Sequence, residues 1–493
     1  MTARQALWLV ALALGLRLAL AAVLPLTGDE AYFVVWGRNP ALGYYDHPPM
    51  IGWWLAALLP WGDHPLWLRM PALLVSLVPG LLLYLLFRHE DPERARLLGL
   101  LGLFLPLFTI GLISSTDTPL ILFSLLSAYV LHRALAAGSR AGYLLAGVLL
   151  GLALLSKYLA GLLALAYAVY FLFWDRGRWR VLFYLVAGSL PFFLINLYWN
   201  WNHCGYNILF NFVSRAQDGG FDALNLATYL LVLAYFYTPW LLWFVWRRRR
   251  DLRERLQGQP HRLWAVAGLV PLGLLLLLAP FKSAGLHWVA PFGALPLVLA
   301  MVLADGELRR SLRWMAYFAL LQTAALGGLS LAPIEWLSGH PRYASAVINL
   351  KAGEVARELF ALDPEGRFMT GSYSRSALLA YHGRRHVGVF GGGSRYGRQD
   401  DLLTDFHALE GETLYILLRR ETADLDEYRP LFGQVRSHRI EVYGAGFTVL
   451  EGSGFDYEAY RETVIAEVLE RHYDPPGWLP IRRCAFVERY AQD

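Results

Sequence analysis

The chain has 493 residues, of which 56% are hydrophobic and 17% are charged, whereas a soluble globular domain carries about 25% charged residues. This composition excludes a soluble enzyme and indicates a polytopic membrane protein. The formal net charge of +5 does not indicate a nucleic-acid-binding protein, because the basic residues lie in short loops between apolar runs.

Apolar runs long enough to cross a bilayer, about 20 residues each, recur through the first two thirds of the chain. No clear cleavage site follows the first run, so we expect a retained signal anchor rather than a removed signal peptide. Eleven spans are predicted, at 6–25, 66–87, 97–113, 118–135, 141–156, 158–174, 181–198, 226–246, 263–281, 286–304 and 313–331.

The positive-inside rule predicts how these spans are oriented. With a cytoplasmic N-terminus, the five loops predicted on the cytoplasmic side hold eighteen arginines, which satisfies the rule. The opposite face of the predicted bundle holds only Arg38, Arg69, Lys157, Arg215 and Lys282. The apolar stretch 141–174 must then be two short helices that meet near Ser156, because a single span would reverse every later loop.

After residue 331 the composition changes to a charged, mixed sequence with no span. Short β-type runs and helical segments are interspersed there, which is typical of a small α/β domain. The strand-like runs lie at 387–390, 413–418 and 447–450, and the helical segments at 373–383 and 457–473. We therefore expect a membrane domain over 1–331 and, outside the cytoplasm, an α/β domain over 332–493.

The segment "GDEAYF" begins the long outer loop 26–65 and places Asp29 and Glu30 side by side after the first span. They are either solvated acids at a helix end or functional carboxylates, since a carboxylate at the bilayer edge can act as a general base or hold a cation. Neighbouring residues of a helix do not share a face, so we expect different roles for the two. The half-apolar segments 31–36 and 50–59 suit helices lying in the membrane interface.

A third acid, Asp117, lies in "SSTDTPLILF" on the same outer face. Its simpler interpretation is structural: Asp117 or Thr118 caps the next helix, and Pro119 occupies the first turn. The alternative is that Asp117 faces one cavity together with the acids of the first outer loop. The two interpretations are compatible.

Several outer-face cations form a candidate site for an anionic ligand: Lys157, Arg215, Lys282 and His287. Each of them alone is explained by snorkelling from a helix end. As a group they suit a phosphate, and nearby carboxylates suit a transfer in which an acid deprotonates a hydroxyl while cations stabilise the departing phosphate. Tyr45 and His47 in "YYDHPPM" are further substrate-binding candidates. The alternative for that segment is a rigid turn set by its two prolines.

Familiar nucleotide and metal motifs are absent from the sequence, including Walker A, HExxH and paired CxxC. The run "GGGS" at 391–394 is a weak nucleotide loop, since nucleoside triphosphates are scarce outside the cytoplasm. Cys204 and Cys484 have no metal-ligand spacing and do not indicate a disulfide framework, and the sequence leaves open whether they pair. The acid pair can hold a divalent cation, but the sequence requires no cofactor.

Five segments resemble, in their order, those of the polyprenyl-phosphate-sugar-dependent glycosyltransferases of the GT-C fold. They are "GDEAYF", "YYDHPPMIGWW", "SSTDTPLILF", "GVLLGLALLSKYLAGLL" and "KSAGLHWVAP". The chain looks most like the bacterial branch of glycosyltransferase family 39, which is related to lipid A aminoarabinose transferases and protein O-mannosyltransferases. The resemblance implies inverting transfer of one sugar from a polyprenyl (undecaprenyl) phosphate to a lipid, glycan or protein, at the outer face of the bacterial inner membrane.

The resemblance makes Asp29 the expected general base, with Glu30 and Asp117 as supporting or acceptor-positioning acids. It places Lys157 and the segment Lys282–His287 near the donor phosphate. The aminoarabinose transferases tend to have Lys before the Pro-Pro pair, where this chain has His47. The resemblance therefore identifies neither the sugar nor the acceptor.

Two other classes fit a polytopic bundle with charges on its outer face. A lipid or glycolipid transporter or flippase usually places some ionisable residues near the bilayer midplane, whereas here they cluster at one face. The second class, a non-catalytic assembly subunit, does not explain why carboxylates and lysines cluster on the outer face. We expect the enzyme, with a polyprenyl-phosphate-linked sugar and membrane lipids as its partners and no nucleic acid.

Overall fold

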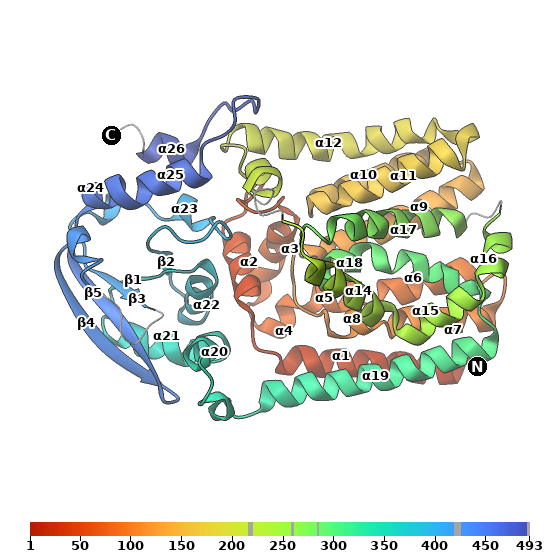
Figure 1. Ribbon diagram of the computed structural model, residues 1–493, viewed down its shortest axis with the longest axis horizontal. Coiled ribbons are helices and arrows are strands. Elements are labelled where there is room, and N and C mark those ends of the chain that lie inside the picture. Colours follow the sequence, from red (N-terminus) through yellow and green to blue (C-terminus); the bar gives the residue numbers. More distant parts are fainter. Residues whose placement is uncertain (215–219, 258–260, 283–284, 419–424, 491–493) are drawn as a thin grey trace.

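The computed structural model describes residues 1–490 apart from 215–219, 258–260, 283–284 and 419–424. Figure 1 shows a bundle of long helices at one end of the molecule and a mixed α/β unit at the other. Between them, α2 (Gly28–Arg38) and α22 (Tyr373–Gly383) face each other.

Six helices of the described residues are long and apolar enough to cross a membrane. They are α1 (Ala3–Val23), the run of α5 (Met70–Val75) and α6 (Val78–Phe87), α9 (Asp117–Ala137), α12 (Val181–Trp201), α17 (His261–Leu278) and α19 (Asp305–Leu331). A seventh candidate is α14 (Ala223–Tyr237) with α15 (Pro239–Arg247), which bend by 82° relative to each other. The predicted number of eleven spans is therefore not confirmed.

The other four predicted spans are short or interrupted helices. Their elements are α7 (Pro92–Leu103) with α8 (Pro106–Ile110), α10 (Arg140–Leu154), α11 (Gly161–Phe173), and α18 (Leu286–Gly293) with the 3-10 helix η5 (Leu295–Val302). Prolines 106, 239 and 296 lie at the start of the second element of the broken pairs. Proline lacks the backbone donor that continues a helix, and apolar content alone does not reveal such a break.

The stretch 141–174 is two helices, as the orientation argument required. After α10, residue Lys157 is extended, with φ −166° and ψ 141°, and α11 then begins at Gly161. Lys157 contacts the first residue of α9, Asp117, and Arg178 beyond α11 donates to the Leu135 carbonyl near the end of α9. Helix α10 therefore returns to the start of α9, and α11 leaves again in the opposite direction.

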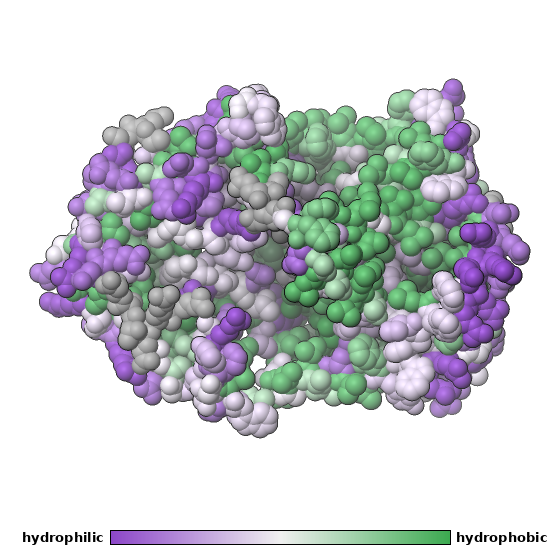
Figure 2. Space-filling view, in the orientation of Figure 1, coloured by the Kyte–Doolittle hydropathy of each residue, from purple (hydrophilic) through white to green (hydrophobic). Residues whose placement is uncertain are grey.

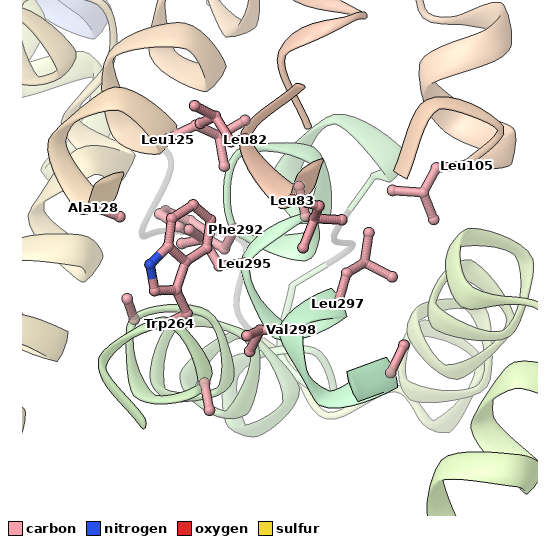
Figure 3. Close-up of a cluster of buried hydrophobic side chains, with 14 of the residues drawn as sticks. Leu82, Leu83, Leu105, Leu125, Ala128, Trp264, Phe292, Leu295, Leu297 and Val298 are labelled. Carbon is pink, nitrogen blue, oxygen red and sulfur yellow. The ribbon is translucent and has the colours of Figure 1, made fainter. Parts of the chain in front are cut away.

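Buried apolar side chains from helices far apart in sequence hold the bundle together. Figure 3 shows the centre of this core, where Trp264 of α17 lies among side chains of α6, α9, α18 and η5. Helices α10 and α12 approach still more closely, because a Cβ on Gly147 or Gly188 would clash with the backbone of the other helix. Small residues allow such close packing where the lipid supplies no hydrophobic driving force between helices.

The surface of the bundle matches a membrane environment. Figure 2 shows apolar side chains covering the helices, with polar side chains gathered at the end where α16 (Arg249–Leu256) lies and over much of the α/β unit. Large apolar residues that face outward include Phe183, Leu231, Leu277 and Leu321. Exposed apolar surface of this extent indicates a lipid-facing belt.

The α/β unit is built on a five-stranded sheet in the order β2-β1-β3-β5-β4. The strands are β1 (Arg367–Thr370), β2 (Gly388–Val389), β3 (Leu414–Leu417), β4 (Phe432–Val442) and β5 (Ala445–Phe455). Strand β1 is parallel to β2 and β3, whereas β5 is antiparallel to β3 and β4. The predicted runs correspond to β2, β3 and β5. Strands β1 and β4 were not predicted, and β4 lacks an apolar run because six of its eleven residues are exposed.

Helices pack around this sheet and in the loops that join it to the bundle. They include α3 (Met50–Leu58), α4 (Pro65–Leu68), α13 (Tyr206–Ile208), α20 (Tyr343–Leu350), α21 (Ala352–Ala361), α23 (Asp400–Leu403), α24 (Tyr457–Tyr460), α25 (Ala466–His472) and α26 (Ala485–Tyr490). Helix α22 matches the predicted segment 373–383, and α24 and α25 lie within the predicted segment 457–473.

Two features attach the α/β unit to the outer loops of the bundle. A Cβ on Gly28 would lie 2.7 Å from the Cβ of Ser374, so glycine allows the start of α2 to approach α22. A disulfide joins Cys204, just after α12, to Cys484, just before α26. The sequence left this pairing open because 280 residues separate the two cysteines.

Candidate functional site

Asp29 lies in the first turn of α2, at the junction between the bundle and the α/β unit. Thr27 caps this helix and forms a reciprocal capping box with Glu30, so the turn that carries Asp29 is fixed. The Asp29 carboxylate is exposed and accepts a hydrogen bond of 3.0 Å from the hydroxyl of Tyr373 in α22. Burial, followed by the neighbouring Asp29, raises the pKa of the Tyr373 phenol, which therefore remains a donor.

The Glu30 side chain points into the protein interior, whereas the Asp29 carboxylate is exposed. The buried Glu30 side chain receives two hydrogen bonds, of 2.8 and 2.7 Å, from the guanidinium of Arg69. Arg69 also donates to the backbone carbonyls of Ala21, Leu24 and Pro25. This arrangement locks the end of α1 to the start of α2 and leaves Asp29 as the accessible acid of the pair.

Asp117 forms a buried ion pair with Lys157, with distances of 2.9 and 3.1 Å from the lysine Nζ to the two carboxylate oxygens. The capping interpretation of Asp117 is wrong, because Thr116 is the N-cap of α9 and makes no side-chain cap bond. Snorkelling does not describe Lys157 either, since only 7% of this residue is exposed. The structure thus joins two of the predicted site residues directly.

A pocket of about 840 Å³ opens beside this ion pair, and we call it the cationic pocket. Lys157, Lys282 and Arg395 line it together with the polar residues Tyr158, Asn211, Asp222, Asn225 and Tyr396. Its apolar wall consists of Leu159, Leu162, Phe212, Leu275, Leu278, Phe281 and Trp288. A cavity lining that combines cations with apolar side chains suits an amphiphile with an anionic headgroup.

Arg395 was not predicted from the sequence. It follows the "GGGS" run in the α/β unit, and only the docking of that unit brings it to the bundle. The run itself is not a phosphate loop, because two of its carbonyls, those of Gly392 and Ser394, accept hydrogen bonds from Arg398. The sequence offered one signal for Arg395, a cation directly after a glycine-rich run. No local pattern connected this residue to Lys157 or Lys282.

Two other predicted residues, His287 and His47, are not part of the lining of the cationic pocket. His287 is exposed at the start of α18, and its ring contacts Trp288, which does line the pocket. The His47 ring contacts Trp36 and Phe210. Arg215 lies outside the described residues.

Tyr45 is buried in an aromatic cluster with Tyr206, Phe210 and Tyr473. Its backbone N–H donates to the Gln399 side chain, and the backbone N–H of Gly397 donates to Asp46. The segment "YYDH" therefore holds the loop that carries Arg395 against the first outer loop. Burial raises the pKa of the Tyr45 phenol, as expected for a packed rather than a reacting tyrosine.

The acid pair does not form a metal-ligand set, because Arg69 occupies Glu30 while Asp29 faces Tyr373. Within the part of the chain that the structure describes, no three His, Cys, Asp or Glu side chains gather as a metal site. The side chains around Asp29 and Glu30 therefore do not fit a divalent cation held by the pair.

Comparison with known proteins supports the resemblance found in the sequence. Residues 46–199 match the family "Dolichyl-phosphate-mannose-protein mannosyltransferase". A lipid A galacturonosyltransferase, RgtD of Rhizobium johnstonii, is 29% identical over 181 residues. That alignment covers 36% of this chain and 38% of the relative, so the chain matches well under half of that relative's length.

Solved structures share the fold over nearly the whole chain. ArnT from Cupriavidus metallidurans in the apo state gives a TM-score of 0.63 at 15% identity, covering 90% of this chain and 97% of ArnT. ArnT bound to undecaprenyl phosphate gives 0.62 at 15% identity, covering 91% and 98%. An oligosaccharyltransferase from Archaeoglobus fulgidus gives 0.50 at 13% identity, covering 93% and 75%. The predicted fold, a GT-C-type membrane bundle with a small C-terminal α/β unit, is confirmed.

Proposed function

We propose that this GT-C-fold protein is a membrane glycosyltransferase that moves one sugar from a polyprenyl phosphate to a hydroxyl of an acceptor outside the cytoplasm. The observation that carries the proposal is the cationic pocket, in which Lys157, Lys282 and Arg395 lie beside an apolar wall. Residues 1–331 would form the membrane domain with most of this pocket, and the domain 332–493 would close it with Arg395.

The donor chemistry fits the cationic pocket in two ways. Lysine and arginine bind phosphate oxygens through charge-assisted hydrogen bonds. Leucine and aromatic side chains suit the first isoprene units of a lipid carrier. Lys157 (which pairs with Asp117), Lys282 and Arg395 all line the pocket and together bring positive charge to the place proposed for the phosphate. The solved ArnT structure with undecaprenyl phosphate, which has the same fold, supports this class of donor.

The proposed reaction uses Asp29 as general base. Asp29 removes the proton from the acceptor hydroxyl, whose oxygen attacks the anomeric carbon of the donor sugar. The bond between that carbon and the phosphate oxygen breaks, and the bond electrons leave with the polyprenyl phosphate. Cations of the pocket stabilise the developing negative charge. Attack opposite the leaving group inverts the anomeric configuration.

Tyr373 connects Asp29 to the cationic pocket. Its hydroxyl holds the Asp29 carboxylate, and a Cβ on Gly397 would overlap its ring, so the ring packs directly against that glycine. Gly397 follows Arg395 and Tyr396 of the pocket lining by one or two residues. Domain 332–493 therefore supplies both a positioning residue for the base and a cation for the donor phosphate.

Replacing Tyr373 with Phe is expected to lower kcat about tenfold without changing donor binding, because a hydrogen bond to a charged group contributes about 1.5–3 kcal/mol. Initial rates at varied donor and acceptor concentrations would measure both quantities. Tyr381→Phe is the matched control, since the hydroxyl of Tyr381 donates to the backbone carbonyl of Asp63 and not to Asp29. An unchanged kcat in Tyr373→Phe would contradict a positioning role.

Replacing Lys282 or Arg395 with Met is expected to raise KM for the donor about tenfold or more, since each change removes a charged hydrogen-bond donor, a loss of about 1.5 kcal/mol or more. Arg384→Met serves as control, because Arg384 is exposed and pairs with Asp63 away from the pocket. If KM for the donor is the same in all three variants, Lys282 and Arg395 do not bind the donor.

The function itself is tested with purified protein in liposomes, a radiolabelled polyprenyl-phosphate sugar and a membrane lipid extract. Transfer of the label to a new lipid, with release of polyprenyl phosphate, is the expected result. Movement of the intact donor across the bilayer without cleavage would instead identify a flippase. If the label stays on the carrier and the carrier stays in its original leaflet, both the transferase and the flippase function are refuted.

The location of the reaction is proposed from the disulfide and from the arginine distribution. Disulfides persist in oxidising compartments and are rare in the bacterial cytoplasm. The Cys204–Cys484 bond joins an outer loop to domain 332–493, so both belong on the periplasmic side of an inner-membrane protein. The relative named for lipid A galacturonosyl transfer supports a lipid-linked acceptor.

A further inference from the structure

A second cavity, of about 410 Å³, lies at the other side of the junction, and we call it the lateral pocket. One wall is the chain that leaves α1, from Leu24 to Leu26, with His64 and Pro65 at the start of α4. The opposite wall comes from α20, α21 and α22, with Asn349, Glu354, Arg357 and His382. None of these residues lines the cationic pocket.

The lateral pocket is next to the proposed base. Leu26 in its wall precedes Asp29 by three residues, and Arg69 fixes this wall by donating to the carbonyls of Leu24 and Pro25. On its other side, Asp29 bonds Tyr373, whose ring packs on the loop that carries Arg395. The Asp29–Tyr373 contact is therefore connected to the lateral pocket through the chain at Leu26 and to the cationic pocket through the loop that carries Arg395.

The lateral pocket also lies at the edge of the apolar belt. Helix α1 ends at Val23, and a Cβ on Gly327 of α19 would lie 3.9 Å from the Val23 side chain. Just beyond that contact, Leu329, Leu331 and Trp336 are exposed by 73%, 71% and 77%. Such side chains at the end of a span face lipid or its interface. An occupant that enters here would come from the outer leaflet, with its polar part in the pocket.

The polar lining favours a carbohydrate over a purely anionic group. It offers one cation, Arg357, one carboxylate, Glu354, an amide and two imidazoles, so no charge sign dominates. The side chains of Arg357 and Glu354 make no hydrogen bond or ion pair within the described part of the chain. Burial lowers the pKa of His382, which keeps that ring neutral near pH 7 and able both to donate and to accept. Mixed donors and acceptors of this kind match sugar hydroxyls.

We propose that the lateral pocket binds the carbohydrate headgroup of a glycolipid acceptor from the outer leaflet and presents its hydroxyl to Asp29. This inference rests on the proposed glycosyl transfer, and it assigns Glu354 and Arg357 as acceptor-binding residues. The donor and the acceptor then reach Asp29 from separate sides, so neither has to leave before the other can bind.

The test compares Glu354→Gln and Arg357→Ala with Glu358→Gln, an exposed residue of the same helix outside the pocket lining. With lipid A as acceptor probe, the first two variants are expected to raise acceptor KM about tenfold, with donor KM unchanged. Glu358→Gln is expected to behave as wild type. Equal acceptor KM in all three would overturn the inference, whereas absent donor cleavage in the wild type would instead refute the proposed function.

A binding measurement separates headgroup recognition from general membrane affinity. Full-length protein in nanodiscs is titrated with lipid A and, separately, with phosphatidylglycerol and phosphatidylethanolamine. We expect lipid A to bind the wild type at least tenfold more tightly than it binds Arg357→Ala. Equal binding of all three lipids, or binding of phosphatidylglycerol alone, would overturn the assignment of a carbohydrate site.

Discussion

Asp29→Asn is expected to reduce the rate of sugar transfer by about two to four orders of magnitude, the range that general-base catalysis contributes. The amide has nearly the same shape and still accepts the Tyr373 hydrogen bond, but it cannot take a proton from the acceptor. Initial rates at saturating donor and acceptor would measure the loss, and retained binding of the radiolabelled donor would show that the site is intact.

Asp63→Asn is the matched control for this substitution. Asp63 also lies in the first outer loop, and its carboxylate pairs with Arg38 and Arg384 at the surface. The control should retain transfer within a few-fold of the wild type. Transfer by Asp29→Asn at a similar level would remove Asp29 from the base role and leave the fold assignment untouched.

Arg69→Met is expected to lower the free energy of unfolding by about 3–5 kcal/mol, the usual cost of removing one partner of a buried ion pair. The change leaves the Glu30 carboxylate buried without its cation and removes the donors to three backbone carbonyls. Thermal unfolding of the detergent-solubilised protein would report it as a lower Tm.

The double variant Arg69→Met/Glu30→Gln distinguishes the cause of that loss. Removing the stranded charge should restore part of the stability, so the double variant should unfold above Arg69→Met and below the wild type. Arg461→Met is the surface control, because its partner Glu458 is exposed and such pairs contribute little. A Tm for Arg69→Met equal to that of the control would contradict the structural role of the pair.

The sequence predicted those residues of the candidate site that stand out from their neighbours in the chain. Asp29, Asp117, Lys157 and Lys282 are polar residues at the ends of apolar runs, and that pattern is visible without a fold. The partner of each could not be predicted in this way. Tyr373 lies 344 positions from Asp29, and the pairing of Asp117 with Lys157 rather than with its own helix end depends on how α9 and α10 pack.

The fold was predicted in class but not in number of spans, for a physical reason. Hydropathy measures whether a segment tolerates lipid, whereas a helix continues only if each backbone donor finds its acceptor. Thr238 before Pro239 adopts a positive φ of 65°, and the helix axis turns by 82° there without any loss of apolar character. Broken helices of this kind are tolerated where neighbouring helices cover them.

The Cys204–Cys484 bond has a consequence for how the chain matures. With the α/β unit on the periplasmic side, as proposed, the thiol of Cys204 has no native partner until the last segment of the chain has been exported, because Cys484 is synthesised 280 residues later. Closure of the bond is then among the final steps of assembly, because it follows insertion of every later helix of the bundle. A thiol oxidant on the outer side of the membrane thus becomes a requirement for finished protein, and a C-terminal truncation before residue 484 would leave Cys204 open to pairing between molecules.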